Sequence, residues 1–326
     1  MPQPPAARIY RGTPRNLAVL ARALKAGELV AVPTETVYGL AANAFDARAC
    51  RKIFRAKGRP THDPLIVHIH SPGELAAVAK PNPAARLLAK KFWPGPLTLV
   101  LPKQHAVPAI VTAGRSSVAV RMPAHRLFRR LLRLAGVPLA APSANPFGYV
   151  SPTTAAHVQN GLGHRIRHIL DGGAAHIGLE STIVDMRNPA RPRLLRPGAI
   201  TRAQLEETLG RPVAAGRRGE KSSAQLAPGM LRRHYSPRTP VVLHQSMPAR
   251  RAAAEAWVFI AKPARTRARN VFWLDARGNL RGAARRLFAT LRRLDGGRFE
   301  KIHIELARDG GLADAINDRL RRAAAR

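Results

Sequence analysis

The stretch VPTETVYGL, residues Val32–Leu40, places two threonines and a glutamate directly after a short apolar run. The run Leu29–Val32 has the length and composition of a buried strand, and Pro33 ends it. We expect Thr34 to cap a helix that begins within Thr36–Ala42. A helix N-terminus presents free backbone N–H groups, so hydroxyls beside it could hold a small polar molecule. An ordinary capping turn would use the same residues.

The same alternation of apolar runs and polar ends continues along the chain, with intervening segments whose apolar residues recur at helical spacing. Strands alternating with helices predict an α/β fold, and consecutive runs without a helix between them predict a mixed sheet. The expected strands are Leu29–Val32, Pro64–Ile69, Leu97–Leu101, Ser117–Arg121, Pro138–Ala141, His168–Leu170, Ser181–Asp185 and Arg193–Arg196. The expected helices are Arg15–Lys25, Ala47–Lys57, Pro83–Phe92, His125–Leu134, Thr153–Val158 and Arg202–Leu209.

A long polar segment follows Gly210. Residues 211–240 are rich in Gly, Ser and Pro and lack periodicity, which predicts a linker. Loops of this length are uncommon in compact domains unless they carry function. Four further strands and two amphipathic helices are expected beyond it: Val241–His244, Ala256–Ile260, Asn270–Leu274, Lys301–Leu306, Leu280–Leu294 and Leu312–Ala323. We therefore expect three parts: a domain over 1–210, a linker over 211–240 and a small α/β domain over 241–326.

The composition is strongly basic, with 55 Lys and Arg against 19 Asp and Glu and a formal charge of +36. Such a surface attracts polyanions. A general preference for arginine explains the total equally well, since 45 of the 55 are Arg. The single cysteine excludes an internal disulfide, and with no signal peptide evident we expect a cytoplasmic protein. No apolar run approaches the roughly 18–20 residues of a membrane span, so we expect no membrane partner.

Two cations lie at the end of an expected helix, in the segment AKGRPTHDPLIVHIH. Lys57 and Arg59 flank a glycine before an apolar strand, a placement suited to clamping phosphates. His68 and His70 point to one face of that strand and could be grouped with His62 as metal ligands. Because no cysteine or acidic pair supports that grouping, we expect no metal held by protein ligands.

One arginine is expected on a buried strand. In SSVAVRMP, Arg121 shares a strand face with Ser117 and Ala119. A buried guanidinium needs an anion. An internal ion pair and a bound carboxylate are both open at this point.

Three further segments end strands in small polar or cationic groups. APSANPFGYVSPTTA carries Ser143 and Ser151, GLESTIVDM carries Ser181, and LLRPGAI carries Arg196. Such strand ends are typical of nucleotide sites in α/β sheets, although plain turns use the same residues. The chain has no Walker A, GxGxxG, GxSxG or paired CxxC motif.

Eight segments, taken in order over Leu17–Leu209, closely resemble the YrdC-like threonylcarbamoyl-AMP synthase family: PTETVYGL, KGRPTHDPLIVHI, FWPGPLTLVLP, VAVRMP, APSAN, SPT, LESTIVD and LRPGAI. The segment APGMLRRHYSP, residues 227–237, resembles the long form of that family. The resemblance implies a twisted mixed sheet with surrounding helices and a large basic cavity. It also implies a small Rossmann-like α/β C-terminal domain.

The resemblance implies a reaction as well. L-threonine, bicarbonate and ATP would give L-threonylcarbamoyladenylate and pyrophosphate, with Mg²⁺ bound to the ATP phosphates. A separate transferase would use the product to modify adenosine 37 of tRNAs that read ANN codons. That transferase, and tRNA itself, are the macromolecular partners this implies.

Residues that match family positions can then be given roles. Those matching L-threonine positions are Thr36, His68, Arg121, Ala141 and Ser181, and those matching ATP positions are Arg59, Asp63, Ser117, Ser143, Ser151, Arg196 and Tyr235. Lys57 and Arg59 would be catalytic, by stabilising phosphate charge. Arg121, for which no acidic partner is evident, would pair with the threonine carboxylate. Tyr235 lies in the linker, which would fold over the nucleotide as a lid.

Three other interpretations remain open. A protein that binds double-stranded RNA or tRNA without synthase activity explains the charge, but not the hydroxyl and imidazole groups. A carbamoyl-transfer module of hydrogenase maturation proteins would carry zinc-finger cysteines, which this chain lacks. A regulatory protein that senses a nucleotide would keep the same residues.

Overall fold

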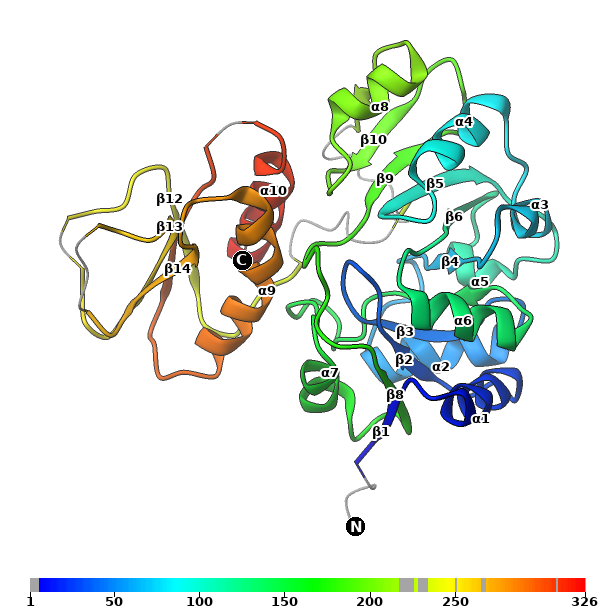
Figure 1. Ribbon diagram of the computed structural model, residues 1–326, viewed down its shortest axis with the longest axis horizontal. Coiled ribbons are helices and arrows are strands. Elements are labelled where there is room, and N and C mark those ends of the chain that lie inside the picture. Colours follow the sequence, from blue (N-terminus) through cyan, green and yellow to red (C-terminus); the bar gives the residue numbers. More distant parts are fainter. Residues whose placement is uncertain are drawn as a thin grey trace.

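Two β-sheets organise the chain, one of eleven strands and one of four (Figure 1). The computed structural model describes residues 6–216, 226–227, 234–249, 251–264, 268–308 and 310–325. In the larger, mixed sheet the strand order is β1-β8-β2-β3-β7-β4-β6-β5-β9-β10-β11. In the smaller, wholly parallel sheet it is β12-β15-β13-β14. The expected α/β fold, with a mixed sheet and a second small unit, is confirmed.

The strands of the larger sheet are β1 (Arg8–Arg11), β2 (Val30–Val32), β3 (Gly39–Asn43), β4 (Ile66–His68), β5 (Leu97–Pro102), β6 (Ser117–Arg121), β7 (Leu139–Ala140), β8 (His168–Asp171), β9 (Thr182–Asp185), β10 (Arg193–Arg196) and β11 (Ala214–Ala215). Those of the smaller sheet are β12 (Val241–His244), β13 (Ala256–Ala261), β14 (Val271–Asp275) and β15 (Ile302–Glu305). The helices are α1 (Pro14–Lys25), α2 (Ala47–Lys57), α3 (Leu75–Val78), α4 (Pro83–Phe92), α5 (Ala109–Thr112), α6 (Arg126–Ala135), α7 (Ala155–Leu162), α8 (Arg202–Leu209), α9 (Leu280–Asp295) and α10 (Ala313–Ala324), with a 3₁₀ turn at Pro72–Glu74.

The prediction of a helix that begins within Thr36–Ala42 is wrong. The chain instead makes a hairpin in which β2 and β3 pair antiparallel, with Val32 opposite Gly39. The Thr34 hydroxyl accepts hydrogen bonds from the backbone N–H groups of Thr36 and Val37, each at 3.1 Å, and lies 2.6 Å from the Val37 carbonyl. The hydroxyl that would have capped a helix therefore closes a turn.

Two strands of the larger sheet bring the expected site residues together. β4 and β6 are parallel neighbours, and their last residues, His68 and Arg121, are register partners. β9 lies two strands from β6, next to β5, to which it is parallel. It starts just after Ser181. β5 and β9 run antiparallel to β6, so the residue before β9 lies at the same edge of the sheet as the carboxyl ends of β4 and β6, and this edge gathers polar groups from distant segments.

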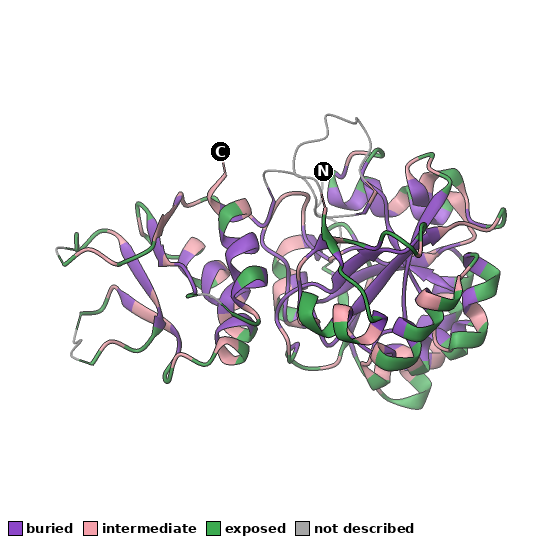
Figure 2. Ribbon diagram, turned by 90° about the horizontal axis from the view of Figure 1, so that it is seen from above, coloured by how far each residue is buried: buried purple, intermediate pink, exposed green. Residues whose placement is uncertain are grey.

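Apolar helices cover both faces of the larger sheet (Figure 2). One apolar cluster includes side chains of α2, α4 and α8, and the other includes side chains of α1 and α6. Figure 2 shows the buried strands between half-buried helices whose outer faces are exposed. In the described ranges, no helix is long and apolar enough to cross a membrane.

The helices of the smaller sheet face the larger unit (Figures 1 and 2). α9 and α10 pack on Val258, Leu274 and Ile304, and lie between this sheet and the N-terminal part of the chain. Tyr149 donates to the Asp295 carboxylate at the end of α9, at 2.7 Å. The two units therefore meet through their polar side chains as well as through packing.

Gly178 shows how closely the units approach. It has a φ of +77°, and a Cβ built on it would lie 2.5 Å from the Cα of Arg285 in α9. Gly173 in the same segment has nearly the same φ, +78°, but nothing lies within 4 Å of a Cβ there. Comparing an alanine substitution at each of the two glycines therefore distinguishes the cost of backbone strain from the cost of a clash between the units.

We expect Gly178→Ala to destabilise the protein more than Gly173→Ala. Gly173→Ala should lower the free energy of unfolding by about 1 kcal/mol, the lower end of the cost of a left-handed alanine. Gly178→Ala adds the displacement of α9, for which overpacking typically costs a further 1–3 kcal/mol. Thermal denaturation of both variants measures the difference. Equal melting temperatures would contradict the close approach.

Candidate active site

A narrow cavity lies at the carboxyl ends of β4 and β6. Nine of the thirteen residues expected in the site line it: Thr36, Arg59, His68, Arg121, Ala141, Ser143, Ser181, Arg196 and Tyr235. Three others bond to groups that line it: Lys57 to the Ser143 carbonyl, Asp63 to Arg59, and Ser151 to Glu180. Ser117, at the opposite end of β6 from Arg121, does not line it.

Arg121 has an acidic partner, so the expectation that it lacks one is wrong. Glu35, in the turn between β2 and β3, lies 2.7 Å from Arg121 Nη2, and both side chains are almost fully buried. Another nitrogen of the same guanidinium donates to the Thr36 hydroxyl at 3.0 Å. Burial alone would raise the pKa of Glu35, but the Arg121 charge and hydrogen bond bring it below its usual value. The strand spacing gave no sign of this pair, because Glu35 is 86 positions away in the sequence.

His68 is a neutral imidazole in this environment. It is buried beside the Phe128 ring, with the ring centres 5.5 Å apart. Burial, with a smaller effect of the Arg121 charge, lowers the pKa of His68 to about 3. No partner for its Nδ1 is found among the described residues, so the ring can offer one nitrogen to a bound molecule.

Two buried cations lie at the C-terminal end of α2, as the sequence indicates: Lys57 is its last residue and Arg59 follows Gly58. Gly58 ends the helix in the left-handed conformation, so that Lys57 and Arg59 both turn inward. Lys57 Nζ donates to the carbonyls of Ser143, at 2.6 Å, and Asn145. Burial, and then the Arg59 charge, lowers the pKa of Lys57 well below its usual value. Asn145, two residues from Ser143, thus joins the site through its backbone carbonyl, which no side-chain motif signals.

Arg59 is fixed in its own ion pair. Its guanidinium lies 2.9 Å from the Asp63 carboxylate and donates to the carbonyls of Asp63 and Pro64. Arg59 and Asp63 both belong to the loop between α2 and β4, so the pairing is local. It aims one face of a planar cation at the cavity.

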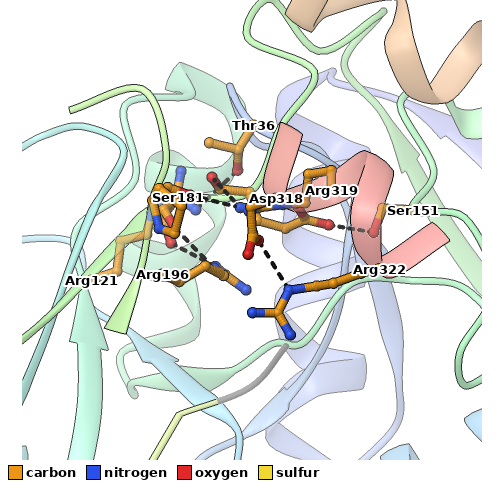
Figure 3. A network of polar contacts seen from close by, with 10 residues as sticks. Thr36, Arg121, Ser151, Ser181, Arg196, Asp318, Arg319 and Arg322 are labelled. Atoms are coloured by element: carbon orange, nitrogen blue, oxygen red, sulfur yellow. Dashed lines mark hydrogen bonds and ion pairs between the residues drawn. The ribbon is translucent and has the colours of Figure 1, made fainter. Parts of the chain in front are cut away.

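Another arginine that lines the cavity, Arg196, is fixed by Ser181, just before β9. Arg196 ends β10 and donates to the Ser181 carbonyl and hydroxyl, each at 3.1 Å (Figure 3). The Ser181 hydroxyl lies 2.7 Å from that of Thr98 on β5. Ser181 thus lies between a cation and a hydroxyl, both from buried strands.

The C-terminal part of the chain closes the cavity. His234 and Tyr235 line it, and Tyr235 has a φ of +61° and is only 1% exposed. The remaining free space is about 40 Å³, room for roughly three water molecules. The large size expected for the cavity stays a prediction, since these two side chains occupy part of the space in this arrangement. The rest of the linker, residues 217–225 and 228–233, lies outside the described residues.

Across the described part of the chain, no group of three or more His, Cys, Asp or Glu side chains is placed to hold a metal ion. The grouping of His62, His68 and His70 considered from the sequence is therefore not assembled. The charged groups around the cavity are instead mainly cations, which suits an anionic ligand.

Known proteins similar to this chain share nearly its whole length. A threonylcarbamoyl-AMP synthase of Pyrococcus abyssi is 41% identical over 94% of both chains. One of Bacillus subtilis is 39% identical over 95% of this chain and 93% of the relative. The crystal structure of P. abyssi Sua5 complexed with L-threonine superposes with a TM-score of 0.89 at 39% identity, covering 98% of both chains.

Family models divide the chain in the same way. Residues 22–198 match the Sua5, YciO and YrdC model described as telomere recombination. Residues 200–325 match the threonylcarbamoyl-AMP synthase C-terminal domain. The chain therefore belongs to the Sua5/YciO/YrdC family, as a long-form member that carries the synthase C-terminal domain.

Proposed function

We infer that this chain is a threonylcarbamoyl-AMP synthase. It condenses L-threonine, bicarbonate and ATP into L-threonylcarbamoyladenylate and pyrophosphate, and the product serves threonylcarbamoylation of tRNA. The identity of about 40% with synthases over almost the whole chain supports this, as does the likeness to a structure that holds L-threonine. A single cysteine permits no internal disulfide, which supports a cytoplasmic enzyme.

One observation carries the proposal: hydroxyl, imidazole and guanidinium groups meet at one end of the cavity. Arg121 contacts Glu35 and Thr36 and is the register partner of His68, so three polar groups surround a single guanidinium. An amino-acid carboxylate fits this set, because Arg121 lines the cavity and offers N–H donors to it, whereas its partner Glu35 does not line the cavity. Neutral His68 and Ser181 are suited to hold the threonine hydroxyl. The role of Ala141 is to line the wall.

The other end suits a triphosphate. Lys57, Arg59 and Arg196 are buried cations, and two of them face the cavity directly. We assign Asp63, Ser143, Ser151 and Tyr235 to the same ligand. Ser117 is the weakest member of the proposed ATP set, since it does not line the cavity. Mg²⁺ would enter with the phosphates, because the described residues provide no cluster of ligands for it.

The reaction then needs two bond-forming steps. The threonine amine adds to bicarbonate and loses water, which gives N-carboxy-threonine. A carbamate oxygen attacks the α-phosphorus of ATP, and pyrophosphate leaves. The residues contribute position and charge: Arg121 fixes the amino acid, while Lys57, Arg59 and Arg196 stabilise the negative charge that develops on the phosphates.

We propose that the chain divides into a catalytic domain over 1–210, a linker over 211–240 and a Rossmann-like domain over 241–326. The larger sheet extends slightly further, to Ala215 in β11, and the smaller one begins at Val241. The free space of about 40 Å³ is smaller than ATP, and His234 and Tyr235 line it, so movement of these two side chains would enlarge it. This supports a lid role for the linker.

Amino-acid dependence tests the function. With ATP, Mg²⁺ and bicarbonate present, L-threonine should support pyrophosphate release, and omitting bicarbonate should abolish it. Valine has the shape of threonine without the hydroxyl, so we expect at least 100-fold lower kcat/KM with valine, because polar groups of the site would be left unpaired. Pyrophosphate release that ignores the amino acid would overturn the proposal.

Replacing Lys57 tests the phosphate end. We expect Lys57→Met to lower kcat/KM for pyrophosphate formation by about 100-fold or more, equal to about 2.7 kcal/mol of lost transition-state stabilisation. Lys52→Met is the control, since Lys52 belongs to the same helix but bonds to the Gly27 carbonyl instead. We expect it to stay within threefold of the wild type. A near-normal Lys57→Met enzyme would reject the assignment.

The neutral state of His68 has a consequence for stability. Its pKa in the folded protein, about 3, is below the usual 6.5, so the unfolded state takes up the proton first. This contribution to stability is complete above pH 6.5 and is lost as the pH falls toward 3. We expect wild type to lose about 1–2 kcal/mol more unfolding free energy than His68→Gln between pH 7.5 and 5. Denaturant titrations measure this, with the exposed His105→Gln as control. Equal losses in wild type and His68→Gln would show that His68 is charged when folded.

A further inference from the structure

The C-terminal unit inserts one fully buried arginine beside the cavity. Arg319, on α10, is 1% exposed and is the bulkiest of the fully buried side chains among the described residues. Its Nε donates to Glu180 Oε2 at 2.8 Å, and its Nη2 to the Pro197 carbonyl at 3.0 Å. The guanidinium also lies 5.3 Å from the centre of the Tyr235 ring. A single side chain from α10 thus contacts three segments that border the site.

Glu180 is the group that needs explaining. It is a buried carboxylate, 6% exposed, and it lines a cavity whose other charged walls are mostly cations. Its second oxygen accepts from the Ser151 hydroxyl at 2.5 Å. A carboxylate left uncompensated here would repel the phosphates of ATP and would be costly to bury. Arg319 supplies the missing charge.

The charged side chains around Arg319 form a row that has no net charge. Arg319 Nη1 donates to Asp318 at 2.8 Å, and Asp318 accepts from Arg322 Nε at 3.0 Å. Two carboxylates and two guanidinium groups therefore alternate from Glu180 to Arg322, as Figure 3 shows for the labelled members. Without Arg319, the three remaining groups, Glu180, Asp318 and Arg322, carry one net negative charge, located at the cavity wall.

We propose that Arg319 is a positioning residue for the nucleotide end of the site. It neutralises Glu180 and holds that carboxylate so that Glu180 orients the Ser151 hydroxyl. The C-terminal domain thereby completes the ATP site of the N-terminal domain. The role rests on the proposed function, because ATP is the ligand that the charge would repel. Lysine can replace only the charge of Arg319, since an ammonium group lacks the planar fork that reaches Glu180, Asp318 and Pro197 together.

The test separates charge from structure with a double variant. We expect Arg319→Met to raise the KM for ATP at least tenfold, and to leave the KM for L-threonine within twofold. The KM for ATP of Arg319→Lys should lie between those of the wild type and Arg319→Met. In Glu180→Gln/Arg319→Met the repelling charge is gone and an amide oxygen can still accept from Ser151, so we expect the KM for ATP to return to within threefold of wild type.

A matched control lies in the same domain. Arg286 of α9 forms an ion pair with Asp275 at 2.9 Å, far enough from the cavity that it does not line it. Arg286→Met should leave both KM values unchanged. Titration of each variant with a non-hydrolysable ATP analogue provides a readout that needs no turnover, and circular dichroism verifies folding.

The outcomes distinguish this role from the proposed function. If wild type binds the analogue but Arg319→Met binds it equally well, the positioning role is wrong and the synthase assignment stands. If the double variant is as impaired as Arg319→Met, Arg319 acts through packing, and the charge argument is wrong. If wild type binds no ATP analogue and releases no pyrophosphate, the proposed function fails, and the role of Arg319 fails with it.

Discussion

The burial of positive charge around one cavity is the constraint on which the rest of the structure depends. Lys57, Arg59, Arg121, Arg196 and Arg319 are all at most 6% exposed. A buried cation is costly unless it is paired or hydrogen-bonded. Acidic residues are scarce in this chain, so backbone carbonyls and hydroxyls provide much of the compensation. Loop paths such as Ser143–Asn145 therefore have to bring their carbonyls to the cations.

That constraint explains why the site is built from loops held by strands. Arg196 bonds to both the backbone and the hydroxyl of Ser181, and Arg59 bonds to two carbonyls of its own loop. Each cation therefore fixes a segment of backbone while it offers charge to the cavity. Because these groups are oriented without a ligand, on the proposed function they would need little reorganisation when negative charge develops on a phosphate.

The sequence was sufficient to predict most helices and strands and nine of the residues that line the cavity. Local signals, such as apolar runs of strand length and the Gly58 helix end, carried the helices and strands, whereas the resemblance to a known family supplied site residues such as Ala141 and Tyr235. The hairpin of β2 and β3 was mispredicted because a threonine that can cap a helix can equally close a turn. The partner of Arg121 was missed because only the pairing of strands that are distant in the sequence brings Glu35 close to it. No local spacing indicates which strands pair.

The contribution of α10 was beyond sequence reasoning for a different reason. The segment NDRLRRAA contains three arginines at positions that suit a solvated helix face, and nothing local singles out Arg319. Its burial comes from the docking of the C-terminal unit against Glu180, 139 positions earlier. Gly178 permits that docking, since any side chain there would meet α9. The glycine and the glutamate are two residues apart, so one short segment both allows the second domain to approach and presents the carboxylate that the domain must neutralise. A domain that moved away to admit a nucleotide would take the compensating charge with it. On electrostatic grounds, phosphates should therefore be held best when the two units are closed.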